Sequence, residues 1–529
     1  MPSLKKNSYG PSQEGPVVIV VMDGIGEAPN DPSNAVTQAN TPFLDSLKKS
    51  VPWTQLQAHG TSVGMPSDKD MGNSEVGHNA LGCGRVFDQG AKLVENAINS
   101  GELFEGEHWK NCVQRALNGG TLHFLGLLSD GNIHSHIRHL EAMLEKAKSA
   151  GVENCRVHGL LDGRDVGEYS ALDYFEPLEK KLHSMGYSFA SGGGRMHITM
   201  DRYGADWDMV ERGWKTHVLG EGSRFPTATE AIMSLREANP GVTDQFLPSF
   251  VVGNDKRQGP LIHKGDAVIF FNFRGDRSIE ITQAFEGVAP FQQEDLGVYY
   301  VGMMQYDGDL KLPTNFLVNP PVINETLGQW LAESKMKTLA ISETQKYGHV
   351  TFFWNGNRSG YVDKNYEKYI EIPSDNVPFE TAPKMKAVEI TDTVIQELDN
   401  NFDHIRINYA NGDMVGHTGD MQATITAVET VDRCLARLSK EVLKHKGTLL
   451  ITADHGNADN MFDVIDGKKV VVSSHTLNPV PLYLVSGDTS HMRLKNNPDA
   501  GLANVAATTC DLLGFQGPDS YYPSLLERI

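Results

Sequence analysis

Carboxylate and imidazole side chains recur in this sequence directly after short apolar runs or in glycine-rich stretches. The runs VVIVVM and TLLIT lead into aspartates, and NGDMVGHTG, ADHGN and SSHTLNP supply the other candidate groups. A site that mixes carboxylate oxygens with imidazole nitrogens suits Mn²⁺, Zn²⁺, Fe or Co²⁺, whereas Mg²⁺ and Ca²⁺ prefer oxygen ligands alone. With one serine, these groups are enough for two metal ions. The carboxylate and imidazole residues of this set are Asp23, Asp413, His417, Asp454, His455 and His475.

Each of these residues also has a purely structural interpretation. A single Asp-Gly pair is typical of a turn, and an isolated histidine is typical of the surface or of a satisfied core. The prediction of a metal site therefore depends on their occurring together at the ends of predicted strands.

Ser74 lies in DKDMGNSEVGHNALG, a polar stretch without apolar periodicity. A serine hydroxyl is a weak nucleophile at neutral pH unless a base or a metal lowers its pKa, and a two-metal site can both ionise it and hold phosphoryl oxygens. A permissive turn would let Ser74 approach a cation. The structural alternative is a helix cap, in which Asn73 or Ser74 opens a helix and Glu75 lies near its positive end. Both interpretations can hold at once.

A second group of candidate residues is cationic and lies in the middle of the chain. The planar guanidinium of arginine matches phosphate and carboxylate oxygens, so several arginines at strand ends indicate a small ligand with several negative charges. The alternative for any one arginine is a surface ion pair. The stretches LLDGRDV, GGGRMHITMDRYG and FFNFRGDR supply Arg164, Asp165, Arg195, Arg202, Arg274 and Arg277.

The stretch HSHIRH, residues 134–139, has the spacing H-x-H-x-x-H, which resembles a zinc-ligand pattern. It follows the predicted strand end LLSDGNI and belongs to the same part of the chain as the arginines. We therefore favour His134 as a partner of phosphate or carboxylate over His134 as a zinc ligand.

Short β-branched runs that end in small or charged residues alternate with helix-like segments. This pattern predicts an α/β fold with a mainly parallel sheet, in which ligands bind at the carboxyl ends of the strands. One group of runs lies near residue 20, one in the middle of the chain, and one after LKLPTNFLVNPPVINET, residues 310–326. That stretch is rich in proline and asparagine and is interpreted as a linker.

Length and composition limit the possible partners. A chain of 529 residues predicts two domains, because single cores stop growing near ~250–300 residues. The formal charge of −20 disfavours nucleic acid and anionic membranes as partners. Five scattered cysteines without a C-x-x-C pair indicate a reducing compartment. The run VVIVVM is too short to span a bilayer, so we expect a cytoplasmic protein with a loose N-terminal tail.

Taken together, the motifs resemble those of the cofactor-independent phosphoglycerate mutases, a family of the alkaline-phosphatase superfamily. The resemblance covers nearly the whole chain from about residue 16, and the motifs of the middle part make it specific to the mutases. The motifs are VVMDGIG, MGNSEVGHNALG, SDGNIHSHIRHL, LLDGRDV, GGGRM, MDRY, FNFRGDR, ETQKYGHVTFF, GDMVGHTG, ITADHGN and SSHT.

The resemblance implies an alkaline-phosphatase-like doubly wound sheet in two sequence segments, with an inserted α/β transferase domain that closes over the site and excludes water. The implied parts are a flexible tail at 1–15, the first phosphatase-like segment at 16–88, the inserted substrate-binding domain at 89–320 and the second phosphatase-like segment at 321–529.

The resemblance also implies residue roles. Ser74 would be the nucleophile, Asp165 the general base or acid at the C2 and C3 hydroxyls, and Lys346 a further catalytic group. One metal would be held by Asp413, His417 and His475, and the other by Asp23, Ser74, Asp454 and His455. The implied substrate contacts are His134, Arg164, Asp165, Arg195, Arg202, Arg274, Arg277 and Lys346.

The implied activity is the interconversion of 3-phosphoglycerate and 2-phosphoglycerate in glycolysis and gluconeogenesis, through a phosphoserine on Ser74 and without 2,3-bisphosphoglycerate. Two divalent ions are implied, with Mn²⁺ expected and Co²⁺, Mg²⁺ or Zn²⁺ as alternatives, and the chain is expected to be a monomer. A metal-dependent phosphomonoesterase, another phosphomutase of the superfamily and a non-catalytic phospholigand-binding protein remain open as rival functions.

Overall fold

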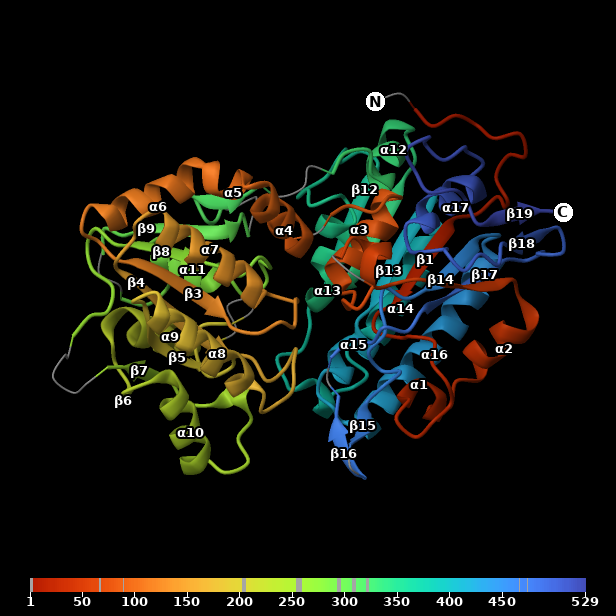
Figure 1. The fold of residues 1–529 in the computed structure, drawn as a ribbon. Coiled ribbons are helices and arrows are strands. Elements are labelled where there is room, and N and C mark those ends of the chain that lie inside the picture. Colours follow the sequence, from red (N-terminus) through yellow and green to blue (C-terminus); the bar gives the residue numbers. More distant parts are fainter. Residues whose placement is uncertain are drawn as a thin grey trace. The chain divides into compact units, whose positions relative to one another are not determined.

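The computed structural model describes residues 3–65, 68–88, 90–201, 206–253, 259–292, 296–306, 311–319, 323–465, 467–472 and 474–529. The fold is mixed α/β, which confirms the prediction from the sequence pattern. The chain divides into two compact units (Figure 1). We call Met1–Gln89 together with Val322–Ile529 the two-segment unit, and Gly90–Pro321 the inserted unit.

The two-segment unit is built on a seven-stranded sheet with the strand order β12-β11-β13-β1-β14-β17-β2. The five strands from β12 to β14 are parallel, whereas β17 is antiparallel to both of its neighbours. Strand β1 comes from the first segment and both of its neighbours from the second, so the sheet joins the two segments. In sheet order the strands are Glu367–Ile372, Thr338–Glu343, His404–Tyr409, Val17–Met22, Thr448–Thr452, Val480–Val485 and Trp53–Leu56.

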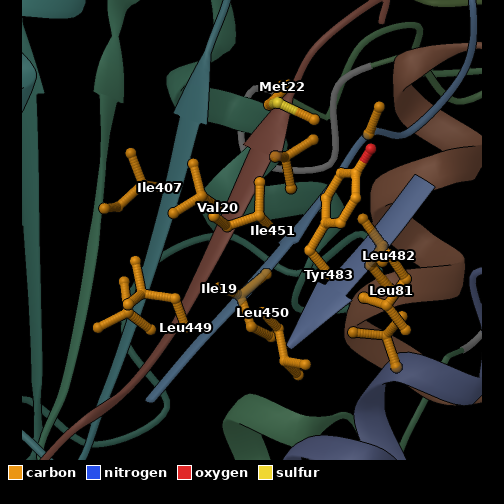
Figure 2. Close-up of a cluster of buried hydrophobic side chains, with 14 of the residues drawn as sticks. Ile19, Val20, Met22, Leu81, Ile407, Leu449, Leu450, Ile451, Leu482 and Tyr483 are labelled. Carbon is orange, nitrogen blue, oxygen red and sulfur yellow. The ribbon is translucent and has the colours of Figure 1, made fainter. Parts of the chain in front are cut away.

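The centre of this sheet is an apolar core. All six residues of β1, VVIVVM, are buried. Parallel strands that are covered on both faces are apolar at every position rather than at alternate ones, which explains why this run is uninterrupted. Figure 2 shows labelled side chains of β1, β13, β14 and β17 packed together with Leu81. The strand ends that follow this core are therefore held in fixed positions.

The inserted unit is built on an eight-stranded sheet with the order β10-β9-β8-β3-β4-β5-β7-β6. Neighbouring strands are parallel except for β5 and β7. The carboxyl ends of β8, β3, β4 and β5 therefore lie along one edge. In sheet order the strands are Phe316–Val318, Tyr299–Met304, Ala267–Phe270, Leu122–Leu127, Cys155–Leu161, Ser188–Gly194, Phe250–Val252 and Ser223–Phe225.

Helices connect the strands in both units, and small antiparallel strand pairs lie outside the main sheets. Helices of the two-segment unit are α1 (Ala35–Gln38), α2 (Pro42–Ser50), α3 (Ser74–Cys83), α12 (Leu327–Glu333), α13 (Thr344–Gly348), α14 (Ala387–Glu397), α15 (Asn411–Gly416), α16 (Met421–Lys444) and α17 (Asn504–Leu512). Its strand pairs are β15 (Phe462–Ile465) with β16 (Lys468–Val471) and β18 (Met492–Leu494) with β19 (Leu526–Arg528).

Helices of the inserted unit are α4 (Gly90–Ser100), α5 (Glu102–Glu105), α6 (Glu107–Leu117), α7 (Ile137–Ser149), α8 (Ala171–Ser184), α9 (Trp207–Trp214), α10 (Ala228–Ala238) and α11 (Ile279–Phe285). In the part of the chain that the structure describes, no helix has both the length and the apolar character needed to cross a bilayer.

The N-terminal segment is not loose from residue 3 onward. Leu4 is buried, and Lys6 forms a β-bridge with Phe515. The backbone N–H of Asn7 donates to the carbonyl oxygen of Gly514 at 2.9 Å. Further along, the backbone N–H of Ser12 donates to Leu512 at the end of α17, and that of Gly15 donates to Lys446 after α16. These contacts differ from the flexible tail expected at residues 1–15.

The stretch at 310–326 is only partly a linker. Its residues Phe316–Val318 form β10, which pairs with β9 at the edge of the inserted sheet. The strand residues themselves, FLV, are apolar, and β9 supplies their backbone hydrogen bonds at the edge of the sheet, where proline in the flanking chain is tolerated.

Candidate active site

The first candidate metal group combines one end of α15 with the loop before β17. Asp413 and His417 lie one helical turn apart, so both point to the same face, and their Oδ1 and Nε2 atoms are 3.1 Å apart. His475 Nε2 lies 3.2 Å from Asp413 Oδ1. One ligand atom from each of the three residues falls within 4.8 Å of the other two. This arrangement fits a metal ion.

His475 is oriented for this role. Its Nδ1 donates to the carbonyl oxygen of Gly72 at 2.8 Å, which leaves the lone pair of Nε2 directed at the group. Burial, followed by the nearby His455, lowers the pKa of His475 to about 3. The ring is therefore neutral at physiological pH, as metal ligation by imidazole requires.

The second candidate metal group lies at the carboxyl ends of two adjacent strands. Asp23 follows β1, and Asp454 and His455 follow β14, its parallel neighbour. The ligand atoms of these three buried residues also fall within 4.8 Å of one another. His455 Nε2 lies 3.9 Å from Asp413 Oδ1. The His455 and His475 rings are stacked, with their centroids 3.8 Å apart. The two groups are therefore side by side.

Ser74 lies beside the second group. It is the first residue of α3, and the side chain of Asn73, not of Ser74, caps that helix by accepting from the backbone N–H of Val76 at 3.1 Å. The Ser74 hydroxyl is 3.0 Å from His455 Nε2 and 3.3 Å from Asp23 Oδ1. The positive end of α3 therefore lies at the site, where it favours an anionic group such as phosphoryl.

Lys346, on α13, connects the serine with both groups. Its Nζ donates to Asp23 Oδ1 at 2.9 Å, to Asp413 Oδ2 at 2.8 Å and to the Ser74 hydroxyl. Although burial opposes its charge, the Asp23 and Asp413 carboxylates raise the pKa of Lys346, so its ammonium stays protonated. The structure thus places Lys346 among the metal-site groups of the two-segment unit.

The electrostatics of the site favour cations. The carboxyl groups of Asp23, Asp413 and Asp454 are all buried, and burial followed by Asp454 raises the pKa of Asp23 to about 6. Buried carboxylates at this density are costly unless cations compensate them. The mixed oxygen and nitrogen donors fit a divalent transition metal.

Further side chains orient these groups and were missed in the sequence. Asn408 on β13 donates to Asp23 Oδ2 at 2.7 Å, and His78 Nδ1 donates to the carbonyl oxygen of Ser74 at 2.8 Å. Asn457 donates to Asp413 Oδ1 at 3.3 Å. The spacing of His78, one turn after Ser74 in MGNSEVGHNALG, is a signal that could have found it.

A second cluster lies at the strand ends of the inserted unit. Arg195, which follows β5 and is 0% exposed, donates from Nη1 to Asp162 Oδ1 at 2.8 Å and to the Asp165 carboxylate. Although burial opposes ionisation, the Arg195 guanidinium lowers the pKa of Asp165. Asp165 is therefore ionised.

His134 joins this cluster. Its Nε2 lies 3.9 Å from Asp165 Oδ2, and its Nδ1 lies 3.5 Å from Asp276 Oδ1. Arg274 Nε approaches the same Asp276 oxygen at 3.2 Å. Burial, followed by Arg195, holds the pKa of His134 well below its ordinary value, so the ring is neutral.

The remaining predicted contacts lie nearby or outside the described residues. The backbone N–H of Arg164 donates to Asp162 Oδ1 at 3.2 Å, which places Arg164 at the same strand end. Arg277 donates from Nη1 to the carbonyl oxygen of Met200 at 2.8 Å. Arg202 lies outside the described residues. The structure thus gathers the predicted residues into two clusters, one in each unit.

Comparison with known protein families, relatives and solved structures agrees with the α/β fold and with the candidate metal ligands. Residues 15–517 match the model of the Metalloenzyme superfamily, so the chain is a metalloenzyme of that class. A probable 2,3-bisphosphoglycerate-independent phosphoglycerate mutase of Leptospira interrogans is 52% identical, and one of Trypanosoma brucei brucei is 48% identical, each over 97% of both chains. A crystal structure of Leishmania mexicana phosphoglycerate mutase at low cobalt concentration matches with a TM-score of 0.91, 46% identity and full coverage of both chains. The chain belongs to the 2,3-bisphosphoglycerate-independent phosphoglycerate mutase family.

This membership confirms the resemblance predicted from the motifs. The protein is therefore an enzyme whose substrate is a small molecule.

Proposed function

We propose that this enzyme interconverts 3-phosphoglycerate and 2-phosphoglycerate through a phosphoserine on Ser74, at a site with two metal ions and without 2,3-bisphosphoglycerate. The observation that carries the proposal is the position of the Ser74 hydroxyl, which lies within hydrogen-bonding distance of Asp23, His455 and Lys346. The names of the relatives supply the substrate class.

Two divalent ions fit the two groups of ligand atoms. We assign one to Asp413, His417 and His475 and the other to Asp23, Asp454, His455 and the Ser74 hydroxyl. When bound, such ions supply Lewis acidity that lowers the pKa of a hydroxyl and neutralises phosphoryl oxygens. Mn²⁺ is the proposed ion, and Co²⁺, Mg²⁺ and Zn²⁺ are alternatives that the same mixture of oxygen and nitrogen donors accepts.

The first half-reaction moves the phosphoryl group to the enzyme. The Ser74 hydroxyl loses its proton, its oxygen attacks phosphorus in line, and the bond from phosphorus to the C3 oxygen breaks. The leaving C3 oxygen takes up a proton, which gives phosphoserine and glycerate. The Lys346 ammonium, which donates to the Ser74 oxygen, stabilises the developing negative charge. The positive end of α3 adds to this stabilisation.

The second half-reaction returns the group to the other hydroxyl of glycerate. Asp165, ionised beside Arg195, accepts the proton of the C2 hydroxyl as that oxygen attacks phosphoserine. The bond from phosphorus to the Ser74 oxygen breaks, that oxygen regains a proton, and Asp165 releases the one it accepted. The arginine cluster holds the glycerate carboxylate during the exchange.

The roles of the units and the cellular setting are part of the same proposal. We assign residues 16–88 and 321–529 to a phosphatase-like part and residues 89–320 to a transferase part that excludes water from phosphoserine. The enzyme acts as a monomer in the cytoplasm, where the five free cysteines stay reduced.

The rival function is a metal-dependent phosphomonoesterase, and an assay separates the two. With Mn²⁺ and no 2,3-bisphosphoglycerate, the purified enzyme is expected to equilibrate 3-phosphoglycerate and 2-phosphoglycerate. The two phosphate esters and any inorganic phosphate are measured by ³¹P NMR. A cluster of arginines around the buried Arg195 can retain glycerate, whereas a hydrolase has no use for retention. Inorganic phosphate as the main product would favour the rival.

Replacing Lys346 with methionine is expected to lower kcat by roughly 10²–10³-fold, the usual cost of losing a donor at a developing charge. The variant should still bind two metal ions per chain, because the ammonium donates to the ligands and does not ligate. Stopped assays and metal analysis measure both quantities. Lys48→Met, which removes an exposed ion pair with Glu27, is the control. Loss of metal would show instead that Lys346 maintains the ligand geometry.

A further inference from the structure

Six buried polar side chains form one continuous chain of hydrogen bonds across the inserted sheet. In order, the chain runs through Asp266, His123, His158, Ser191, His217 and Thr199. Asp266 Oδ2 lies 3.3 Å from His123 Nε2, and His123 Nδ1 lies 2.9 Å from His158 Nε2. Ser191 Oγ lies 2.6 Å from His158 Nδ1 and 2.8 Å from His217 Nδ1, and His217 Nε2 lies 3.0 Å from Thr199 Oγ1. All six are buried, and neither the proposed function nor the sequence motifs account for them.

The direction of this chain is fixed at one end. Asp266 is ionised and accepts hydrogen bonds from the backbone N–H groups of Thr121 and His263, so its carboxylate must also accept from His123 Nε2. Burial lowers the pKa of His123 below its ordinary value, which makes the ring neutral with one donor and one acceptor.

The same reasoning continues from ring to ring. His158 is neutral because burial lowers its pKa, and its Nε2 must donate to His123, so its Nδ1 accepts from the Ser191 hydroxyl. Burial lowers the pKa of His217 to about 3, and its Nδ1 must donate to Ser191. His217 Nε2 is therefore an acceptor, and the Thr199 hydroxyl donates to it.

Thr199 has a backbone conformation that needs such support. Its φ is +75°, which is in the left-handed region that a β-branched residue rarely adopts. The backbone N–H of Thr199 donates to the carbonyl oxygen of Met209 at 3.1 Å. A Cβ at Gly213 would lie 2.3 Å from Thr199 Oγ1, so glycine there permits the close approach. Strain of this kind persists only where several contacts impose it, and it concentrates at functional sites.

The strained residue lies in a turn that connects two of the proposed substrate arginines. Arg195 begins the turn, and its backbone N–H donates to the carbonyl oxygen of Leu161 at 3.0 Å. The carbonyl oxygen of Met200, the residue after Thr199, accepts from Arg277 Nη1 at 2.8 Å. His217 itself lies in a π-helical turn, Lys215–Leu219, a rare irregularity that is frequent at functional sites.

We propose that Thr199 and His217 are positioning residues, which hold the turn at 195–200 so that the Met200 carbonyl orients the Arg277 guanidinium toward a phosphoglycerate anion. The hydrogen-bonded chain that begins at Asp266 makes His217 Nε2 the acceptor for the Thr199 hydroxyl. The inference rests on the proposed function, because it takes Arg277 as a substrate contact.

The test compares Thr199→Val, which removes the hydroxyl and keeps the shape, with Thr199→Ser, which keeps the hydroxyl. Thr199→Val is expected to raise KM for 3-phosphoglycerate about tenfold, the cost of one lost hydrogen bond, with a smaller change in kcat. Thr199→Ser should bring KM back to within about twofold of the parent. Thr229→Val, which removes a hydroxyl contact to Glu179 elsewhere in the unit, is the control.

Three outcomes decide the matter. A Thr199→Val enzyme with a lower unfolding temperature and the parental KM would show a purely structural role and overturn the inference. Arg277→Ala separates this from the proposed function: an unchanged KM there would overturn the assignment of Arg277 and the inference with it. A raised KM in Arg277→Ala with a parental KM in Thr199→Val would overturn the inference alone.

A spectroscopic measurement tests the direction of the chain without any assay. In protein labelled with ¹⁵N-histidine, His217 is expected to carry its proton on Nδ1, whereas His123 and His158 carry theirs on Nε2. Thr199→Val should shift the Nε2 resonance of His217, because that atom loses its donor. Protonation of His217 at Nε2 in the parent enzyme would contradict the donation from Thr199.

Discussion

Replacing Ser74 with alanine is expected to lower kcat by roughly 10⁴–10⁶-fold, the scale seen when a nucleophile is removed. The Ser74 hydroxyl lies 3.0 Å from His455 Nε2 and accepts from Lys346, so it is placed where an ammonium and the candidate metal ligands meet. Without the oxygen no phosphoserine can form, yet the arginine cluster of the inserted unit is unchanged. The variant should therefore still bind 3-phosphoglycerate, as calorimetric titration would measure.

The control for this prediction is Ser439→Ala on α16. Ser439 is also buried in the two-segment unit, and its hydroxyl has no hydrogen-bond partner, so the substitution removes an oxygen without touching the site. Mass spectrometry should detect one phosphoryl group on the peptide that contains Ser74 after the parent enzyme has been mixed with substrate. Turnover by Ser74→Ala at the rate of the control would contradict the nucleophile assignment.

The metal groups could be predicted because their residues follow strands that become neighbours. Asp23 ends β1 and Asp454 follows β14, and parallel pairing brings both carboxylates to one sheet edge. The spacing of Asp413 and His417 places both on one face of a helix turn. The fold class follows from the same alternation of apolar runs and helix-like segments, which is visible without a structure.

The position of Lys346 could not be predicted from its own surroundings. It lies on the short helix α13, and its long side chain reaches Asp23 and Asp413, which are 323 and 67 residues away in the chain. Only the packing of α13 beside β11 and β13 determines that reach. The same holds for Asn408, whose side chain looks like that of an ordinary strand residue until β1 lies next to it.

Two features of the backbone geometry could not be predicted from the sequence. The polar N-terminal residues have no apolar pattern, yet Lys5, Asn7 and Ser12 pair with residues 512–516 through backbone groups that any sequence supplies. The positive φ of Thr199 is likewise invisible in the letters HITM, because threonine there contradicts its own conformational preference. Local conflicts of this kind occur at functional sites, where surrounding contacts override propensity.

Removal of divalent metal is expected to lower kcat by on the order of 10³-fold or more, since metal ions stabilise the transferring phosphoryl group by several kcal/mol. It should also lower the thermal unfolding temperature. The carboxylates of Asp23, Asp413 and Asp454 are buried together, and ions that bind only the folded state add stability, about 2.7 kcal/mol at a hundredfold excess over Kd. Dialysis against a chelator, thermal unfolding and activity after Mn²⁺ is restored measure both effects.

Substituting one metal ligand at a time should show how much each of the two groups contributes to metal binding and activity. His417→Ala removes a ligand of the first group and His455→Ala one of the second, so each is expected to reduce the bound metal from two ions per chain to one. His491→Ala, whose side chain is 45% exposed and lies outside both groups, should keep both ions and full activity. If His417→Ala or His455→Ala kept two ions and normal turnover, its group would not be a metal site, and Ser74 would need another means of activation.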